Sequence, residues 1–257
     1  MRRAIQDCRV LLTGASSGIG AALTRQLATR GARLLVTARR TERLAKLASE
    51  FPNQVEFIAG DITCGAHRAA LVERVRREWG ALDLLINNAG VGAMGRFDDA
   101  DESRLRRIFE VNVFAPLELT RATHSLLSSG RTPAVMAISS VLAHRAVPLK
   151  SEYCATKFAL HGFYDSLRAE WAKEGISIVL VSPSTTDSDF FDAAIEDSTG
   201  REWKGRRPMT PDYVARRAIV AWQRDQHELI LPLSGKLLVT IDRWFPALAD
   251  RLIARFG

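Results

Sequence analysis

Cysteine is scarce in this chain, and the three cysteines present are far apart. Cys8, Cys64 and Cys154 are odd in number and have no C-x-x-C spacing, which argues against a disulfide framework and against a zinc site. The histidines also lack the spacing of metal ligands, so the sequence predicts no metal. Free thiols fit a reducing compartment, and we predict a cytoplasmic protein.

Long hydrophobic runs are absent as well. No stretch is long and apolar enough to cross a bilayer as a helix. The apolar run at residues 10–12 is too short for the core of a signal peptide and leads directly into a glycine-rich turn. With 257 residues, 47% apolar and 25% charged, the composition is that of an ordinary globular protein with one large α/β domain or two small ones.

Acidic residues are in deficit, and the deficit is uneven. The net charge is +7, and residues 201–257 hold eleven Lys and Arg against six Asp and Glu. A basic segment can serve anionic ligands, a membrane surface or nucleic acid. No zinc finger and no basic motif interleaved with aromatic residues is present, so we expect no nucleic-acid partner.

Short apolar runs alternate with amphipathic stretches over most of the chain. Strands are predicted at 8–13, 33–38, 55–58, 82–86, 134–138, 176–181 and 229–231, and helices at 19–29, 42–49, 65–78, 101–128 and through Lys157 to about 173. This alternation is typical of a doubly wound parallel sheet, the Rossmann fold, with helices on both faces. Ligands of such sheets bind at the carboxyl ends of the strands.

A glycine-rich turn, T-G-A-S-S-G-I-G at residues 13–20, joins the first strand to the first helix. Strand, glycine turn and helix form the context of a dinucleotide-binding fingerprint. Gly14 permits the tight turn, Gly18 allows a pyrophosphate to approach the backbone, and Gly20 allows helix and strand to pack closely. No Gly-Lys-Ser/Thr follows, which excludes a P-loop.

The end of the second strand indicates which dinucleotide is bound. An NAD-binding unit carries an acidic residue there to hold the ribose 2′-hydroxyl, but this chain has Ala38 followed by Arg39 and Arg40. Together with hydroxyls from Ser16 and Ser17, two guanidiniums suit a 2′-phosphate. The alternative is that the two arginines are a solvated basic start of a helix.

Polar residues also follow the third and fourth strands. Asp61 could accept a hydrogen bond from an adenine amino group, or it could be a helix N-cap. Asn87 and Asn88 can bond neighbouring loops, and Gly90 allows close approach of a cofactor.

A hydroxyl, a phenol and an ammonium are predicted to meet near residues 139–157. Tyr153 and Lys157 are four apart in a helical segment and therefore share one helix face, and Ser140 follows the strand at 134–138. A nearby cation favours phenolate, so we expect Lys157 to lower the pKa of Tyr153. Asn112 interrupts the predicted helix at 101–128 and is costly in a core unless hydrogen bonded, although a packing role alone is possible.

These motifs resemble the classical short-chain dehydrogenase/reductase (SDR) family from residue 8 to about 231. The matching residues are T-G-x-x-x-G-I-G at 13–20, N-N-A-G at 87–90, Asn112, Ser140 and Y-x-x-x-K at 153–157. The A-R-R turn at 38–40 is similar to that of the NADP(H)-preferring members.

The resemblance implies a role for each matching residue. Tyr153 would be the general acid in reduction and the general base in oxidation, and Ser140 would hold and polarise the substrate oxygen. Lys157 would bond the nicotinamide ribose hydroxyls, and Asn112 would anchor a water molecule for proton relay. The implied cofactor-binding residues are Gly14, Ser16, Ser17, Gly18, Ile19, Gly20, Arg39, Arg40, Asp61, Ile62, Asn88, Ala89, Gly90, Tyr153, Lys157, Pro183, Ser184 and Ser188.

Two positions depart from the family pattern. Ser184 follows Pro183 where the family usually has glycine, and serine lacks the freedom of glycine at positive φ. Ser188 replaces the usual threonine and keeps a hydroxyl. We expect the loop on the nicotinamide side to differ, with the catalytic groups retained.

We predict one SDR domain over 1–257, with a dinucleotide-binding and catalytic core at 8–183, a substrate lid at 184–210 and a C-terminal helical extension at 235–257. Candidate lining residues for the substrate are Phe190, Phe191, Ile195, Trp203, His144 and Arg145. For each of these, ordinary packing or solvation is an open alternative.

The C-terminal extension carries an apolar stripe at helical spacing, formed by Leu237, Ile241, Trp244, Leu248 and Leu252. Pro246 should divide it into two short helices. The favoured interpretation is a cover for the pocket or a subunit interface. A helix lying on a membrane surface is the alternative, although Asp242 and Asp250 interrupt the stripe.

The predicted function is NADP(H)-dependent hydride transfer between a carbonyl compound and an alcohol, on a small and apolar substrate, in a homodimer or homotetramer. The alternative is an NADPH-binding regulatory or interaction protein on the same fold, with little turnover.

Overall fold

A computed structural model describes residues 3–187, 190 and 208–253. Its centre is one seven-stranded sheet in which all strands are parallel, in the order β3-β2-β1-β4-β5-β6-β7. The strands are β1 Arg9–Thr13, β2 Arg33–Thr37, β3 Val55–Phe57, β4 Leu84–Asn87, β5 Ala134–Ile138, β6 Ser177–Pro183 and β7 Glu228–Leu231.

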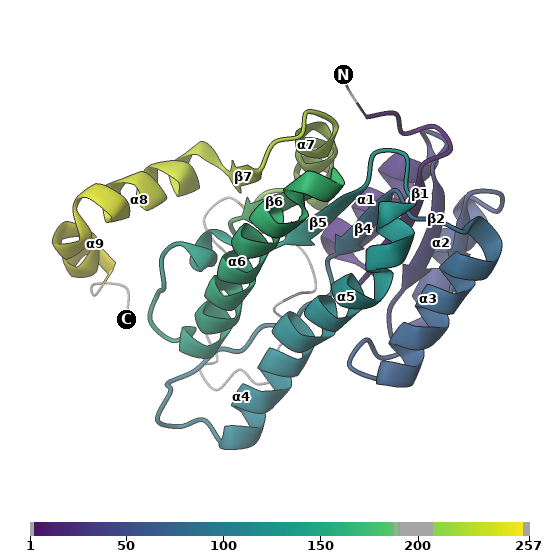
Figure 1. Cartoon of the computed structure of the whole chain (residues 1–257). Coiled ribbons are helices and arrows are strands. Elements are labelled where there is room, and N and C mark those ends of the chain that lie inside the picture. The colour runs from purple at the N-terminus through teal and green to yellow at the C-terminus, as the bar shows by residue number, and fades with distance from the viewer. Residues whose placement is uncertain (1–2, 188–189, 191–207, 254–257) are drawn as a thin grey trace.

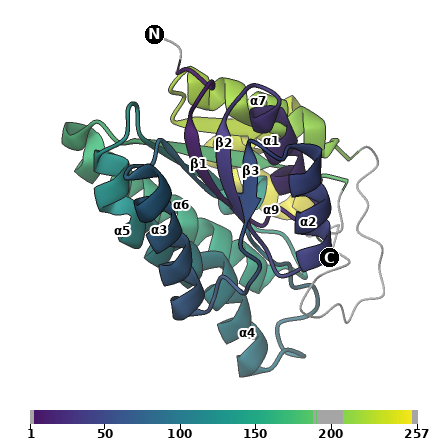
Figure 2. The ribbon, with the colours of Figure 1, turned by 90° about the vertical axis from the view of Figure 1, so that its right-hand side faces the viewer.

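Helices cover both faces of the sheet. They are α1 Gly18–Ala28, α2 Thr41–Glu50, α3 Gly65–Trp79, α4 Glu102–Phe109, α5 Ala115–Ser128, α6 Ser151–Trp171 and α7 Pro211–Gln223, with the π-helix η1 Glu110–Phe114 and the 3₁₀ helices η2 Val141–Ala143 and η3 Ala172–Glu174. Helices α1, α2 and α7 lie on one face, and α3, α5 and α6 lie on the other (Figures 1 and 2). The predicted doubly wound α/β fold is therefore confirmed.

The composition of the strands explains why both faces are covered. Strand β5 reads AVMAI and is buried at every position, so neither of its faces can meet water, and the pattern is continuous rather than alternating. The side chains divide between two cores, one beneath α1 and α7 and one beneath α3, α5 and α6. Because helices fill both sides, the edge formed by the strand ends remains for a ligand.

The helix predicted at 101–128 differs from expectation. The chain follows a helical path, but a five-residue π-helix, η1, separates α4 from α5. Asn112 lies within η1, and its side chain is bonded outside the helix. A π segment of this kind is frequent at functional sites, and it cannot be read from apolar periodicity because it adds only one residue to a turn.

The C-terminal extension projects from the body of the molecule (Figure 1). It forms α8 Leu233–Trp244 and α9 Pro246–Ile253, so the division at Pro246 is as predicted. Asp242 and Asp250, which break the apolar stripe, both pair with Arg145 in the segment after η2. Leu237 and Trp244 are exposed, whereas the side chains of Leu248 and Leu252 lie outside the described part of the chain.

None of the helices that the structure describes has the length and apolar character needed to cross a bilayer. Of the predicted lid at 184–210, residues 184–187, 190 and 208–210 are described. Ser188, Phe191, Ile195 and Trp203 lie outside the described residues.

Candidate active site

A cavity of about 510 Å³ lies at the carboxyl ends of the strands, where the sequence places the ligand. It brings together most of the predicted site residues. They are Gly14, Ser16, Ser17, Gly18, Ile19, Arg39, Arg40, Asp61, Ile62, Asn88, Ala89, Gly90, Ser140, Tyr153, Lys157, Pro183 and Ser184. Gly20 and Asn112 are not among the described residues that line it.

The glycine-rich turn has the geometry that its sequence requires. Gly14 and Gly18 have φ values of +72° and +53°, which residues with a side chain rarely adopt. A Cβ atom on Gly20 would lie 2.2 Å from the carbonyl oxygen of Gly14. Gly20 therefore permits close packing of α1 on the turn rather than contact with a ligand, and Ser17 immediately precedes the helix.

Asn88 holds this turn from the neighbouring strand. Its Nδ2 donates to the carbonyl oxygens of Thr13 and Gly14, at 2.9 and 3.0 Å. The hydroxyl of Thr13 in turn accepts from the backbone N–H groups of Asn88 and Ala89, both at 3.1 Å. Thr13 is a positioning residue that the sequence analysis did not single out, because only strand pairing shows that it faces β4.

The two arginines after β2 differ in their surroundings. Arg40 donates to the hydroxyls of Ser16 and Ser17, at 3.0 and 2.6 Å, which fixes its guanidinium beside the glycine turn. Arg39 is exposed and also lines the cavity. The side chains predicted to surround a 2′-phosphate therefore line one part of the cavity: Ser16, Ser17, Arg39 and Arg40.

Asp61 is held by a local turn. Its Oδ1 accepts from the backbone N–H of Thr63 at 2.9 Å and from the Thr63 hydroxyl at 2.8 Å. Burial alone would raise the pKa of Asp61, but these bonds and nearby Arg39 hold it below its usual range. Helix α3 begins at Gly65 with Cys64 as its N-cap, so the alternative that Asp61 is that cap is wrong.

Ser140, Tyr153 and Lys157 line the cavity from two elements. Ser140 precedes η2 and accepts at its Oγ from the backbone N–H of Leu142 at 3.1 Å. Tyr153 and Lys157 lie on α6, with Lys157 Nζ 5.6 Å from the centroid of the Tyr153 ring. Lys157 also donates to the carbonyl oxygen of Ile138, at 3.1 Å. The i, i+4 spacing thus places both groups on one face, as predicted.

The predicted fall in the pKa of Tyr153 is wrong for this geometry. Burial raises the pKa of Tyr153 above its usual range, and the neighbouring Ser140 hydroxyl offsets this only in part. Burial also lowers the pKa of Lys157 to about 8. Both side chains are almost completely enclosed, and removing a charge from water is the largest effect on each. The pair consequently favours a neutral phenol, the form that can give a proton.

Asn112 is fully bonded within the protein. Its Oδ1 accepts from the backbone N–H of Val91 at 2.8 Å, and its Nδ2 donates to the Val91 carbonyl and the Thr156 hydroxyl, at 2.9 and 3.1 Å. Thr156 donates onward to the carbonyl oxygen of Tyr153 at 2.7 Å. This chain of bonds connects the π-helix η1 to the strand-end loop and to α6.

A buried ion pair supports the start of α6. Arg104 on α4 donates from Nε and a terminal nitrogen to the two carboxylate oxygens of Glu152, at 3.0 and 2.9 Å. The side chains are 1% and 2% exposed. Glu152 immediately precedes Tyr153, but its partner is 48 residues away in the chain, so sequence analysis gave no signal for this contact.

The candidate substrate residues have mixed outcomes. Phe190 lines the cavity, and its ring centroid lies 5.8 Å from that of Tyr153. His144 and Arg145 do not line it: Arg145 pairs with Asp242 and Asp250, while His144 lies beside Glu228. Both residues come directly after η2, but the side chain of His144 contacts β7 and that of Arg145 contacts α8 and α9.

The replacement of glycine by Ser184 causes no backbone conflict. Among the described residues other than glycine, positive φ occurs at Asp7, Leu149 and Asp225. Ser184 is not one of them, and its backbone N–H donates to the carbonyl oxygen of Leu231 at 2.8 Å. Glycine's conformational freedom is therefore not needed here.

Comparison with known proteins gives a consistent result. A family model described as short chain dehydrogenase matches residues 9–199. The Uncharacterized oxidoreductase YxnA of Bacillus subtilis is 27% identical, over 98% of this chain and 72% of its own.

Solved structures show the same likeness. A short-chain dehydrogenase from Streptomyces avermitilis has a TM-score of 0.84 at 29% identity, covering 98% of this chain and 99% of that one. A short chain dehydrogenase/reductase from Burkholderia phymatum, in complex with NAD, has a TM-score of 0.87 at 20% identity, covering 96% of each chain. The chain belongs to the short-chain dehydrogenase/reductase family of oxidoreductases.

Proposed function

We propose that this protein is an NADP(H)-dependent oxidoreductase that interconverts a carbonyl compound and an alcohol. The observation that carries the proposal is the meeting of Ser140, Tyr153 and Lys157 in the same cavity as the glycine turn and two arginines. A binding module for nucleotide alone has no need of the first three groups. Membership of the family supports an oxidoreductase, and Ser140, Tyr153 and Lys157 support the interconversion of a carbonyl compound and an alcohol.

The residues present fit a nicotinamide dinucleotide. Gly90 leaves a concave surface at the strand ends, where a Cβ atom would lie 3.3 Å from Asn112 Oδ1 and 3.8 Å from Lys157 Nζ. Gly14 and Gly18 form a turn at the N-terminus of α1, where N–H groups and the helix dipole favour phosphate. When bound, such a cofactor supplies or accepts the hydride.

Proton transfer at Tyr153 is the protein's part of the chemistry. In reduction, the neutral phenol gives its proton to the oxygen of the substrate, and in oxidation the reverse transfer applies. Ser140 holds that oxygen by a hydrogen bond. The ammonium of Lys157 stabilises the tyrosinate formed and bonds the cofactor ribose, while Asn112 fixes η1 against the Val91 loop and α6.

NADP(H) is proposed over NAD(H) because the cavity wall next to β2 is basic. Arg39 and Arg40 lie there beside Ser16 and Ser17, and a guanidinium matches a 2′-phosphate better than a ribose hydroxyl. The Burkholderia phymatum neighbour binds NAD on the same fold, so the fold itself does not select the cofactor.

We propose an apolar substrate because apolar side chains line the part of the cavity away from the two arginines. Val141, Leu142, Val147 and Phe190 line the cavity near the catalytic groups.

We further propose a cytoplasmic protein, supported by free thiols at Cys8, Cys64 and Cys154. A homo-oligomer is supported by the exposed rings of Phe114 and Phe158, which lie on the neighbouring elements η1 and α6.

The proposal is tested by incubating the purified protein with NADPH and a panel of apolar ketones and aldehydes, with loss of reduced-cofactor absorbance as the readout. Tyr153→Phe removes the transferable proton, and we expect turnover to fall at least ~10²-fold. NADPH affinity, measured by fluorescence titration, should be kept. Full turnover in Tyr153→Phe would refute the mechanism. The alternative of an NADPH-binding regulatory protein would be supported by tight NADPH binding with no turnover on any member of the panel.

A further inference from the structure

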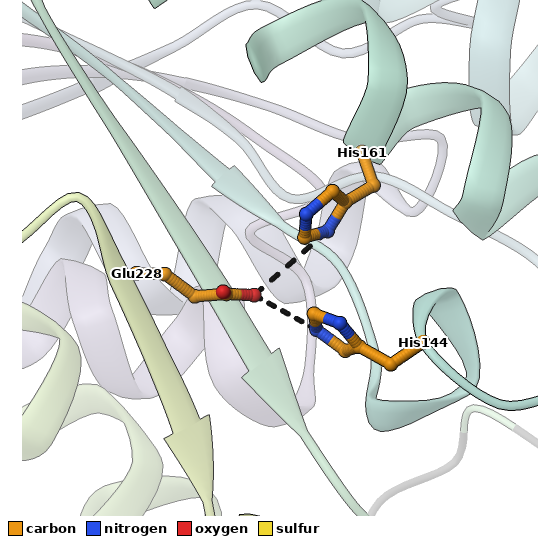
Figure 3. A group of neighbouring side chains, drawn as sticks. All are labelled: His144, His161 and Glu228. Atoms are coloured by element: carbon orange, nitrogen blue, oxygen red, sulfur yellow. Dashed lines mark ion pairs between the residues drawn. The ribbon is translucent and has the colours of Figure 1, made fainter. Parts of the chain in front are cut away.

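Two histidines and a glutamate from distant parts of the chain meet beside the sheet. His144 follows η2, His161 lies on α6 and Glu228 begins β7 (Figure 3). One ligand-capable atom of each lies within 4.8 Å of the others. None of the three is among the described residues that line the active-site cavity. The sequence analysis predicted no metal because these residues have no recognisable spacing.

The separations suit a small metal ion. Glu228 Oε1 lies 2.8 Å from His144 Nε2 and 3.8 Å from His161 Nδ1. Zinc binds nitrogen and oxygen at roughly 2.0–2.2 Å in a tetrahedron, so two of its ligands are about 3.3 Å apart. The two measured separations fall on either side of this value. Small side-chain rotations would therefore place an ion within bonding distance of both imidazoles and the carboxylate.

The imidazole nitrogens that face the carboxylate are buried. His144 Nε2 lies 2.8 Å from Glu228 Oε1, within the distance of an ion pair. His161 Nδ1 lies 3.8 Å from the same oxygen and has no hydrogen-bond partner among the described residues. A buried nitrogen without a partner is costly, and a bound ion would satisfy it.

A second carboxylate lies at the far side of the His161 ring. The other ring nitrogen of His161, Nε2, lies 3.2 Å from Asp165 Oδ2, and metal-binding histidines commonly present their second nitrogen to a carboxylate.

We propose that His144, His161 and Glu228 form a binding site for a divalent transition metal ion, with zinc as the best fit. Two neutral imidazoles and one carboxylate are a donor set that zinc accepts, and a fourth position is left for water. The ion would fasten the segment after η2 to α6 and β7. Ser140 lies four residues before His144, and Lys157 lies four residues before His161. The site would thus brace the two elements that hold the catalytic groups, without itself touching the cavity.

The experiment uses full-length protein without a histidine tag, stripped with a chelator and dialysed. Zn²⁺ affinity is measured by competition with a fluorescent chelator, and Co²⁺ is added separately to record the visible spectrum of the centre. The variants are His144→Gln, His161→Gln and Glu228→Gln. His124→Gln is the matched control, because His124 Nε2 also lies 2.8 Å from a glutamate, Glu174, in an exposed pair. Cys64→Ser excludes binding at the exposed thiol.

We expect one Zn²⁺ per chain, at least about tenfold weaker binding in each of the three variants, and unchanged binding in the two controls. Co²⁺ should give the spectrum of a tetrahedral nitrogen and oxygen site. Absence of micromolar zinc binding, or equal binding by wild type and all variants, would overturn the proposal and leave an ion-pair cluster. If a variant does not fold, histidine NMR of the wild type decides. Zinc should shift two of the five histidine side chains, and a titration that shifts none, or another pair, would also overturn the site.

Discussion

The two halves of the sheet build their parts of the cavity in different ways. In the first half, the glycine turn and the two arginines come from residues 13–40, within one βαβ unit. In the second half, Ser140, Tyr153 and Ser184 come from different elements, after β5, on α6 and after β6. One half depends on local backbone geometry, and the other depends on long-range contacts.

The contacts that support each half reflect this difference. The glycine turn is held mainly by its own backbone and by Asn88 across one strand pairing. Helix α6 is held by Glu152 to Arg104, by Thr156 to Asn112 and by Lys157 to Ile138. The catalytic half should therefore be more sensitive to substitutions far from the cavity, whereas the cofactor half should respond to residues that touch the ligand.

Of the substitutions that test this comparison, we expect the largest effect, a loss of stability, from breaking the buried Arg104–Glu152 ion pair. Glu152→Gln removes the carboxylate that pairs with the buried Arg104 guanidinium, which should lower the free energy of unfolding by about 3–5 kcal/mol. Urea unfolding of the full chain measures this. Glu102→Gln breaks an exposed pair with Arg106 on the same helix and should change stability little.

The double substitution Arg104→Met with Glu152→Leu sharpens this test. It removes both charges, so much of the lost stability should return. If Glu152→Gln alone unfolds at the same urea concentration as wild type, the pair does not support α6.

Arg39→Ala tests the cofactor half. It should weaken NADPH binding by one to two decades and leave NADH binding nearly unchanged, because a hydrogen bond to a charged group is worth roughly 1.5–3 kcal/mol and only NADPH has the 2′-phosphate. Fluorescence titration with both cofactors measures the ratio. Arg30→Ala, at another exposed arginine, is the control. Equal weakening of both cofactors would make Arg39 a general surface charge and remove the basis for NADP(H).

A smaller effect, on NADPH affinity, is expected when the pH is raised and Lys157 loses its charge. Burial lowers the pKa of Lys157 to about 8, so the ammonium is present below that pH and is lost as the pH rises through it. NADPH affinity should fall above pH 8, by about fivefold, because a neutral amine makes a weaker hydrogen bond than an ammonium. Lys157→Met should bind NADPH weakly at every pH without this step. A wild-type affinity that is flat between pH 7 and pH 9 would show that Lys157 does not bind the cofactor as a cation.

The smallest effect on stability is expected from Arg145, which connects the catalytic half of the sheet to helices α8 and α9. Arg145 joins the segment after η2 to Asp242 on α8 and Asp250 on α9. Arg145→Ala should cost at most about 1 kcal/mol, since such pairs are partly exposed, but it should make residues 233–253 more accessible to limited proteolysis. Cofactor affinity should not change. Lys236→Ala on the exposed side of α8 is the control, and identical cleavage rates in both variants would show that Arg145 does not anchor the helices.

Much of the fold could be predicted from local patterns. Apolar runs placed the seven strands to within about two residues, and Pro246 divided the C-terminal segment as expected. The π-helix at 110–114 could not be predicted from apolar periodicity, and the partners of Asn112 within it, Val91 and Thr156, are close to it only in the folded chain. The pKa of Tyr153 was mispredicted for a similar reason, since sequence shows the neighbouring cation but not the degree of burial.

The sequence alone determined which chemical groups are available and in what order. It placed the glycines of the turn, Ser140, and the Tyr153–Lys157 pair on one helix face, because backbone conformation and helical periodicity act over a few residues. Only the tertiary structure decided which buried charges are paired, as in Arg104 with Glu152, and how burial moves the pKa values of Tyr153 and Lys157. It also decided that His144, His161 and Glu228 meet. Desolvation and ion pairing depend on distances between residues far apart in the chain, and folding alone fixes those distances.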